Sequence, residues 1–183
     1  LLKTQFPEVT SNLAFLGALV GSVSRPIGGK LADRIGGAKV TFWNFVAMTL
    51  ATFGLLYSLQ VKEFALFMTS FLGLFITTGI GNGSTFRMIP VIFATERTRE
   101  AAGKGKHAEE QALKEGNKEA AAVLGFAGAI GAYGGFFIPK SYGTSITLTG
   151  GPEGALYVFI VFYLTCIATT WWFYVRKGAR MTC

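Results

Sequence analysis

A single arginine stands at the end of an uncharged stretch near the start of the sequence. Residues 22–37 read SVSRPIGGKLADRIGG, and no charged residue lies from Val9 to Ser24. The guanidinium of Arg25 is planar and can donate two parallel hydrogen bonds to two coplanar oxygen atoms, which an ammonium group cannot do. Arg25 could therefore bind a small planar anion. It could equally extend its side chain towards the polar surface of a membrane, close to Lys30. These residues alone leave both roles open.

Further charges follow Arg25 between two pairs of glycines. The carboxylate of Asp33 could cap a following helix or pair with a basic side chain, and Arg34 could reach the end of a neighbouring helix. Arg87 stands at the end of another apolar stretch, after the polar run GIGNGST. We expect Asp33, Arg34 and Arg87 to act in gating or at lipid headgroups, and we expect Arg87 to touch a substrate less directly than Arg25.

Glycines recur with a regular spacing in a later apolar segment, GFAGAIGAYGGFFIP. They occupy every third position from Gly125 to Gly134, and a further G-x-x-x-G pair ends the series. Such a helix carries a ridge without side chains, which allows close helix packing, sliding, or backbone contact with a small substrate. Packing against another helix is the simplest of these uses. The members of this ridge are Gly125, Gly128, Gly131, Gly134 and Gly135.

Long uncharged stretches place these residues in a membrane. Only 15% of the 183 residues are charged, against about 25% in soluble domains. A helix that crosses a bilayer needs about 20 mainly apolar residues, and a series of uncharged stretches reaches that length. A soluble protein with so many long buried helices would be unusual. We predict an all-α membrane protein with five transmembrane helices at 11–29, 41–60, 64–94, 119–138 and 155–174, and a cytoplasmic connector at 96–118.

The distribution of the basic residues along the sequence predicts the orientation of the chain in the membrane. The segments outside the predicted spans hold one, three, one, six, one and three Lys or Arg residues in chain order. This alternation follows the positive-inside rule and predicts an external N-terminal end and a cytoplasmic C-terminal end. The net charge of +7 is therefore explained by topology, and we expect no nucleic-acid partner. Membrane lipid is the expected surrounding.

The predicted spans lack the residues that catalysis or metal binding would need. No cluster of His, Cys, Asp and Glu occurs in any of them, and Cys166 and Cys183 do not have the spacing of metal ligands. We therefore expect no enzyme activity, no metal and no cofactor. The polar residues Asn82, Ser84 and Thr85 are expected to form hydrogen bonds between helices.

The glycine-flanked loop resembles a motif of the major facilitator superfamily. Those transporters carry G-x-x-x-D-R-x-G-[RK]-[RK] between neighbouring spans, and Gly29, Asp33, Arg34 and Gly36 match it. The final basic pair of the motif is not kept. If this loop is the weaker second copy of the motif, the resemblance implies that the five predicted spans are helices eight to twelve of a twelve-helix fold.

Further segments resemble the NarK-type nitrate/nitrite porters of that superfamily. They are SRPIGGKLADRIGG, GIGNGSTFRMIP, the glycine ridge and KSYGTSITLTGGPEGA, so the resemblance covers most of the chain. Because position 1 is leucine, we expect a C-terminal piece of a longer chain, with the N-terminal half as its partner. The resemblance implies a bacterial inner-membrane protein that takes part in nitrate assimilation by transmembrane transport.

The resemblance also implies roles for particular residues. Arg25 would clamp nitrate or nitrite at a central cavity, together with an arginine from the other half, and Gly125, Gly128 and Gly131 would line the substrate path. Apart from the helix ends, the predicted spans hold no acid and no histidine that could carry a proton, and arginine stays protonated. We therefore expect an antiporter that exchanges nitrate for nitrite by alternating access. The alternatives are a proton-coupled nitrate importer and a facilitator of another small anion.

Overall fold

The computed structural model describes residues 14–179, and every regular element in that range is helical. The α-helices are α2 (Ala14–Ile35), α3 (Gly37–Val61), α4 (Phe64–Ala101), α5 (Lys106–Thr149) and α6 (Glu153–Thr170), and a π-helical turn, Trp171–Val175, follows α6. Apolar segments that cross a lipid phase must satisfy their backbone hydrogen bonds internally, and helices do so within one segment. The predicted all-α class is confirmed for the described residues.

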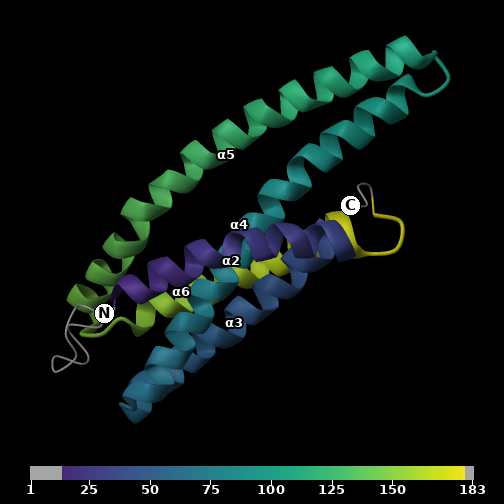
Figure 1. The fold of residues 1–183 in the computed structure, drawn as a ribbon. Coiled ribbons are helices and arrows are strands. Elements are labelled where there is room, and N and C mark those ends of the chain that lie inside the picture. The colour runs from purple at the N-terminus through teal and green to yellow at the C-terminus, as the bar shows by residue number, and fades with distance from the viewer. Residues whose placement is uncertain (1–13, 180–183) are drawn as a thin grey trace.

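Helix α4 is the centre of the arrangement (Figure 1). It packs against α2 along one side and against α3 along another, and α3 in turn packs against α6. Helix α5 meets α4 through its first part and α6 through its last part. Between those contacts α5 arches away from the other helices (Figure 1). The end of α4 and the start of α5 form a long hairpin, and their turn lies at its far end.

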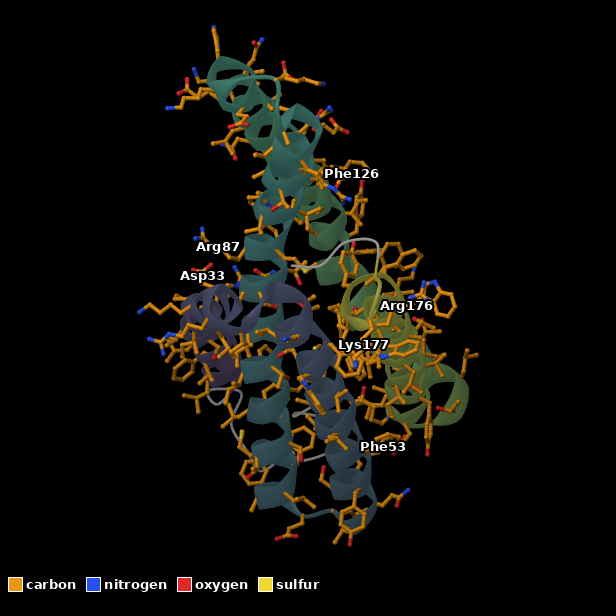
Figure 2. All side chains as sticks on the ribbon, turned by 90° about the vertical axis from the view of Figure 1, so that its right-hand side faces the viewer. Asp33, Phe53, Arg87, Phe126, Arg176 and Lys177 are labelled. Atoms are coloured by element: carbon orange, nitrogen blue, oxygen red, sulfur yellow. The ribbon has the colours of Figure 1, made fainter. Side chains whose placement is uncertain are left out.

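The main apolar core joins α3, α4 and α6. Its buried members are Leu55, Leu56, Leu59, Phe67, Leu156 and Ile160, with Phe71, Leu74, Tyr142 and Phe159 packed at its edge. Many other large apolar side chains are exposed, including Phe126 on α5 and Phe53 on α3, both labelled in Figure 2. An apolar surface of this extent fits contact with lipid or with further helices rather than with water.

Four of the helices are long and apolar enough to cross a membrane: α3, α4, α5, and α6 together with the π-helical turn. The remaining predicted span, 11–29, corresponds to α2, whose described part begins at Ala14. Its second half carries Arg25, Lys30, Asp33 and Arg34, so it does not reach the same apolar character. Residues 11–13 of that prediction lie outside the described residues.

The predicted loop after Gly29 is helical almost throughout. Helix α2 continues to Ile35, and only Gly36, with a φ of 94°, interrupts the helical backbone before α3 begins at Gly37. The helix therefore continues beyond Gly29, the predicted end of the first span. Only one of the glycines provides the turn, because a single positive φ is enough to reverse the chain.

The connector predicted at 96–118 is also mostly helical. Helix α4 runs through Pro90 to Ala101, beyond the predicted end at 94, and α5 begins at Lys106, ahead of the predicted start at 119. The turn is confined to the residues between these helices, where Gly103 and Gly105 have φ values of 83° and 97°. Alanine, lysine and glutamate favour helix, so this charged segment extends the two helices.

The segment between the predicted spans 119–138 and 155–174 is also mostly helical. Helix α5 passes through Pro139 and ends at Thr149, where Gly150 adopts the left-handed conformation with a φ of 79°. The reversal into α6 uses Gly150, Gly151 and Pro152, residue types that are common in turns. The helix therefore continues beyond residue 138, the predicted end of the fourth span, to Thr149.

Candidate functional site

Arg25 lies on α2 with an exposed side chain. Among residues 14–179 its guanidinium has no carboxylate within ion-pair distance. The expected burial against a central cavity is therefore not found in this part of the molecule, because α2 turns another face towards α4 and the described helices leave Arg25 uncovered. The result is a cationic side chain at the end of an uncharged segment, and no described acidic residue neutralises it.

Asp33 and Arg87 form an ion pair that joins α2 to α4. Nε of Arg87 donates a hydrogen bond to Oδ1 of Asp33 over 2.6 Å, and the two side chains are 58% and 47% exposed. Figure 2 shows them next to each other at one edge of the molecule. Exposed pairs of this kind contribute about 0.2–1 kcal/mol, so a conformational change could break this one readily. Arg34 is exposed and has no ion pair among the described residues.

A small cavity of about 240 Å³ adjoins this ion pair. It lies where the end of α2, the start of α3 and the second half of α4 meet, and its lining is Ala32, Asp33, Gly36, Gly37, Arg87, Met88 and Val91. Asp33 is eight residues from Arg25 in α2, which is about 12 Å along a helix. The ion pair and Arg25 therefore occupy different levels of the same α2–α4 interface.

One of the polar residues of α4 forms the predicted bond between helices. Ser84 is buried, and its Oγ lies 3.0 Å from Oγ1 of Thr41 in α3. Asn82 is exposed instead. Another amide, Asn44 of α3, lies directly against Gly81, where an added Cβ would overlap its Nδ2. These contacts hold α3 and α4 together without using a charged group.

The glycine ridge of α5 has no neighbouring helix in the described part of the chain. A Cβ built on Gly125, Gly128, Gly131 or Gly135 would meet no heavy atom within 4 Å, and one on Gly134 would meet only Ile138 of the same helix. The expected close helix contact is therefore absent here, because the middle of α5 arches away from α2 and α6 (Figure 1). No other described helix reaches this surface.

Different glycines allow a close helix contact, and the sequence reasoning missed them. A Cβ on Gly79 of α4 would overlap the carbonyl oxygen of Gly21 in α2, and one on Gly83 would overlap that of Arg25. A Cβ on Gly28 of α2 would in turn approach Cα of Ile80 to 2.7 Å. The missed signal is the G-x-x-x-G spacing of Gly79 and Gly83, which is typical of closely packed membrane helices.

A charged network ties the two arms of the α4–α5 hairpin. Nε of Arg97 donates to Oε2 of Glu119 over 2.9 Å, its Nη2 pairs with Oε1 of the same carboxylate, and its Nη1 lies 3.0 Å from Glu100. These hydrogen bonds hold the start of α5 against the last turns of α4. His107 lies exposed on the same hairpin. No group of three or more metal-ligating side chains occurs within residues 14–179.

Comparison with known proteins gives a consistent set of relatives. No family model matches the chain. The chain is 46% identical to the nitrate/nitrite transporter NarU of Salmonella typhimurium over 98% of its own length and 40% of that protein. It is 45% identical to NarU of Escherichia coli over 97% of its length and 39% of that protein. A probable nitrate/nitrite antiporter, NarK2 of Thermus thermophilus, is 33% identical over 93% of this chain and 34% of the relative.

These similarities agree with the motifs noted in the sequence. The chain spans about 40% of the length of the relatives that it matches at 45–46% identity. Almost every residue of the chain is aligned in those matches, so the similarity is not confined to one motif. The chain is therefore homologous, along almost its whole length, to a part of these nitrate/nitrite porters of the NarK type.

Proposed function

We propose that the protein containing this chain transports nitrate and nitrite across a membrane by alternating access. The observation that carries this proposal is the exposed guanidinium of Arg25, which no carboxylate among residues 14–179 neutralises. A charge near the centre of a membrane helix costs about 2.5–3.5 kcal/mol on insertion scales, so such residues usually face a cavity and serve a function. The relatives named as nitrate/nitrite transporters supply the substrate class.

Arg25 binds the anion through the fork of its guanidinium. Nitrate and nitrite each offer two coplanar oxygens, and two parallel N–H donors match them in geometry and in charge. The helices of the rest of the transporter cover the face of α2 that is open here. The ridge of Gly125, Gly128 and Gly131 packs against those helices, and its bare backbone lines part of the substrate path.

The ion pair between Asp33 and Arg87 acts as a gate. It closes the α2–α4 interface at about 12 Å from Arg25 in one state and opens in the other. The same movement involves Arg34, which contacts the end of a neighbouring helix. It also involves Gly134 and Gly135, which allow helices to slide past each other. The energy of an exposed pair is small enough for anion binding to shift this equilibrium.

Exchange of nitrate for nitrite fits the charges of this chain better than proton symport. A fixed positive site makes the empty carrier unfavourable to reorient, because an uncompensated charge must cross a region of low dielectric. Either anion neutralises that charge and allows the return step. No acid or histidine lies in the uncharged stretches around Arg25 to carry a proton, and arginine does not release its own.

The protein is a multi-pass membrane protein of the bacterial inner membrane with its C-terminal end in the cytoplasm. The orientation follows from the high Lys and Arg content of the α4–α5 hairpin and of the tail. Transport of this kind forms and breaks no covalent bond, so it needs no enzyme activity and no cofactor.

Reconstitution in liposomes tests the mechanism. If the transporter exchanges anions, internal nitrite accelerates the entry of labelled nitrate, and a pH gradient alone has no effect. Accumulation of nitrate driven by a proton gradient, with no internal anion present, would instead identify a proton-coupled importer. Uptake of a small carboxylate at the rate of nitrate would identify a facilitator with broader anion specificity.

A further inference from the structure

We propose that Gly83 is a positioning residue for Arg25: the absence of a side chain at position 83 fixes where the Arg25 backbone lies and therefore where its guanidinium meets the anion. This inference rests on the proposed role of Arg25 in nitrate binding. It concerns the contact between α2 and α4, in which Gly83 lies against the main chain of Arg25 rather than its side chain.

The contact is unusually close on both sides of Arg25. A Cβ on Gly83 would overlap the carbonyl oxygen of Arg25, and it would also lie 3.0 Å from the backbone nitrogen of Gly29. One turn earlier, Gly79 makes the equivalent approach to Gly21, where a Cβ would also lie 2.8 Å from Cβ of Ser24. Since backbone atoms cannot move away as the end of a flexible side chain can, alanine at either position has to push the two helices apart.

The position of Arg25 depends on this separation. Ordinary contacts between heavy atoms are about 3.5–4.0 Å, so alanine at position 83 must displace the α2 backbone at Arg25 by more than about 1 Å. Hydrogen bonds weaken steeply with distance and misalignment, and a two-pronged hydrogen bond must keep both donors in line. Alanine at position 81 should not move Arg25 in this way. Gly81 lies on the other side of α4, against the side chain of Asn44 in α3.

The test uses Gly83→Ala in the full-length transporter, with nitrate as the probe. The expected result is a rise in the KM for nitrate uptake of ~10-fold or more, because a misplacement of about 1 Å at a binding group has effects of this order or larger. The maximal rate and the melting temperature of the purified protein should change far less. An effect on folding alone would lower the melting temperature and the amount of protein while leaving KM unchanged.

Two glycines of the same helix provide matched controls. A Cβ on Gly73 would meet nothing within 4 Å, so Gly73→Ala should leave KM unchanged. Gly81→Ala perturbs the contact of α4 with α3 and should also leave the KM for nitrate near its normal value. A rise in KM for both controls equal to that for Gly83→Ala would overturn the inference, since any alanine in α4 would then have the same effect.

A double-mutant cycle shows whether Gly83 acts through Arg25. In the Arg25→Lys background, Gly83→Ala should cause little further rise in KM, because the fork that it displaces is already lost. If Gly83→Ala raised KM by the same factor in the Arg25→Lys background as in the wild type, the two effects would be additive and the inference would be overturned. If Arg25→Lys alone leaves KM unchanged, the proposed binding role of Arg25 is wrong. A normal KM for Gly83→Ala together with a raised KM for Arg25→Lys rejects only the positioning role.

A milder variant keeps the inference testable if Gly83→Ala does not fold. A Cβ on Gly21 would lie 3.2 Å from the carbonyl oxygen of Phe75, so Gly21→Ala shifts the same interface by a few tenths of an ångström. The expected rise in KM is then about twofold to threefold, because the displacement of Arg25 is smaller. A folded Gly21→Ala transporter with unchanged KM would count against the inference.

Discussion

Arg25 and the pair of Asp33 and Arg87 show how differently charged residues are used along one helix interface. Asp33 and Arg87 neutralise each other across α2 and α4, whereas Arg25 has no such partner within residues 14–179. A cation without a carboxylate partner among the described residues suits the proposed anion binding, whereas a cation that is already paired is suited to holding two helices together.

Replacement of Arg25 by lysine tests the importance of the guanidinium fork. Arg25→Lys keeps the positive charge but loses the two parallel donors, so nitrate affinity should fall by roughly 10- to 100-fold, which corresponds to about 1.5–3 kcal/mol for a charge-assisted hydrogen bond. Binding of nitrate to purified protein by calorimetry measures this change. Lys30→Arg on the same helix is the control and should bind nitrate normally. Unchanged affinity in Arg25→Lys would remove Arg25 from the binding site.

The gating role of the ion pair predicts a different kind of defect. Asp33→Asn should lower the rate of nitrate uptake by up to about fivefold, because an exposed pair contributes at most ~1 kcal/mol to the balance between two states. Exchanging the charges, with Asp33→Arg and Arg87→Asp together, should restore part of the rate. Initial rates of uptake in vesicles measure both effects. A double variant slower than either single variant would argue against a pairwise role.

At the level of elements, the two glycine-rich segments have different surroundings. The glycines of α4 are used within this chain to bring α2 close, whereas the ridge of α5 has no neighbour among the described helices. Helix α5 is also the most isolated of the candidate spans, with none of its most apolar window buried. The ridge is therefore free to contact helices other than those described here, as the proposed function requires.

A bulky residue on the ridge should prevent that contact. Gly128→Leu is expected to abolish nitrate uptake, because a leucine side chain at a close helix contact cannot be accommodated without separating the helices. Ala129→Leu is the control, since the next residue of a helix points about 100° away. Uptake should be measured after confirming that both variants reach the membrane in normal amounts. Normal uptake by Gly128→Leu would place the ridge against lipid.

The α4–α5 hairpin should depend on the Arg97–Glu119 tie. Glu119→Gln removes the carboxylate, so backbone hydrogen exchange near these residues should become faster than in Glu115→Gln, whose carboxylate has no ion pair among the described residues. Equal exchange rates in both variants would show that the tie does not hold the hairpin.

On the scale of the whole molecule, apolar surface and charge are separated along the helices. Large apolar side chains are exposed on every helix, while the end of α4 and the start of α5, on either side of their turn, carry a dense group of charged residues. Near the other end of the chain, the Arg176 guanidinium stacks over the Trp172 ring at 4.3 Å. Figure 2 shows Arg176 and Lys177 together on the side away from Asp33 and Arg87. Both charged regions are rich in Lys and Arg, which fits the prediction that they lie on the same, cytoplasmic side of a bilayer.

The predicted topology can be measured directly with single cysteines. In a background with serine at positions 166 and 183, Lys104→Cys should be shielded from an impermeant thiol reagent added outside intact cells, and Glu153→Cys should react. The reason is the excess of Lys and Arg around the α4–α5 turn, which retains that turn in the cytoplasm. The reverse labelling pattern would invert the proposed orientation.

The sequence by itself determined the class of this protein, most of its helices and its relatives. Long uncharged stretches predict membrane helices without reference to any partner, because the length of a span follows from the thickness of the bilayer. The motifs around Arg25 and Arg87 predicted the porter family, and the alignments with NarU confirm it. The turn at Gly150 was also predictable, since glycine tolerates the positive φ found there.

Only the tertiary structure decided how these residues meet. Asp33 and Arg87 were both candidates, but they lie 54 residues apart, and nothing local indicated that they pair. Helix ends at Ile35 and Ala101 also escaped prediction, because charged helix formers continue a helix beyond the apolar stretch. Spacing alone likewise favoured the α5 ridge over Gly79 and Gly83 as the close helix contact. A glycine becomes a contact only when another backbone comes near it, and that depends on the path of the whole chain.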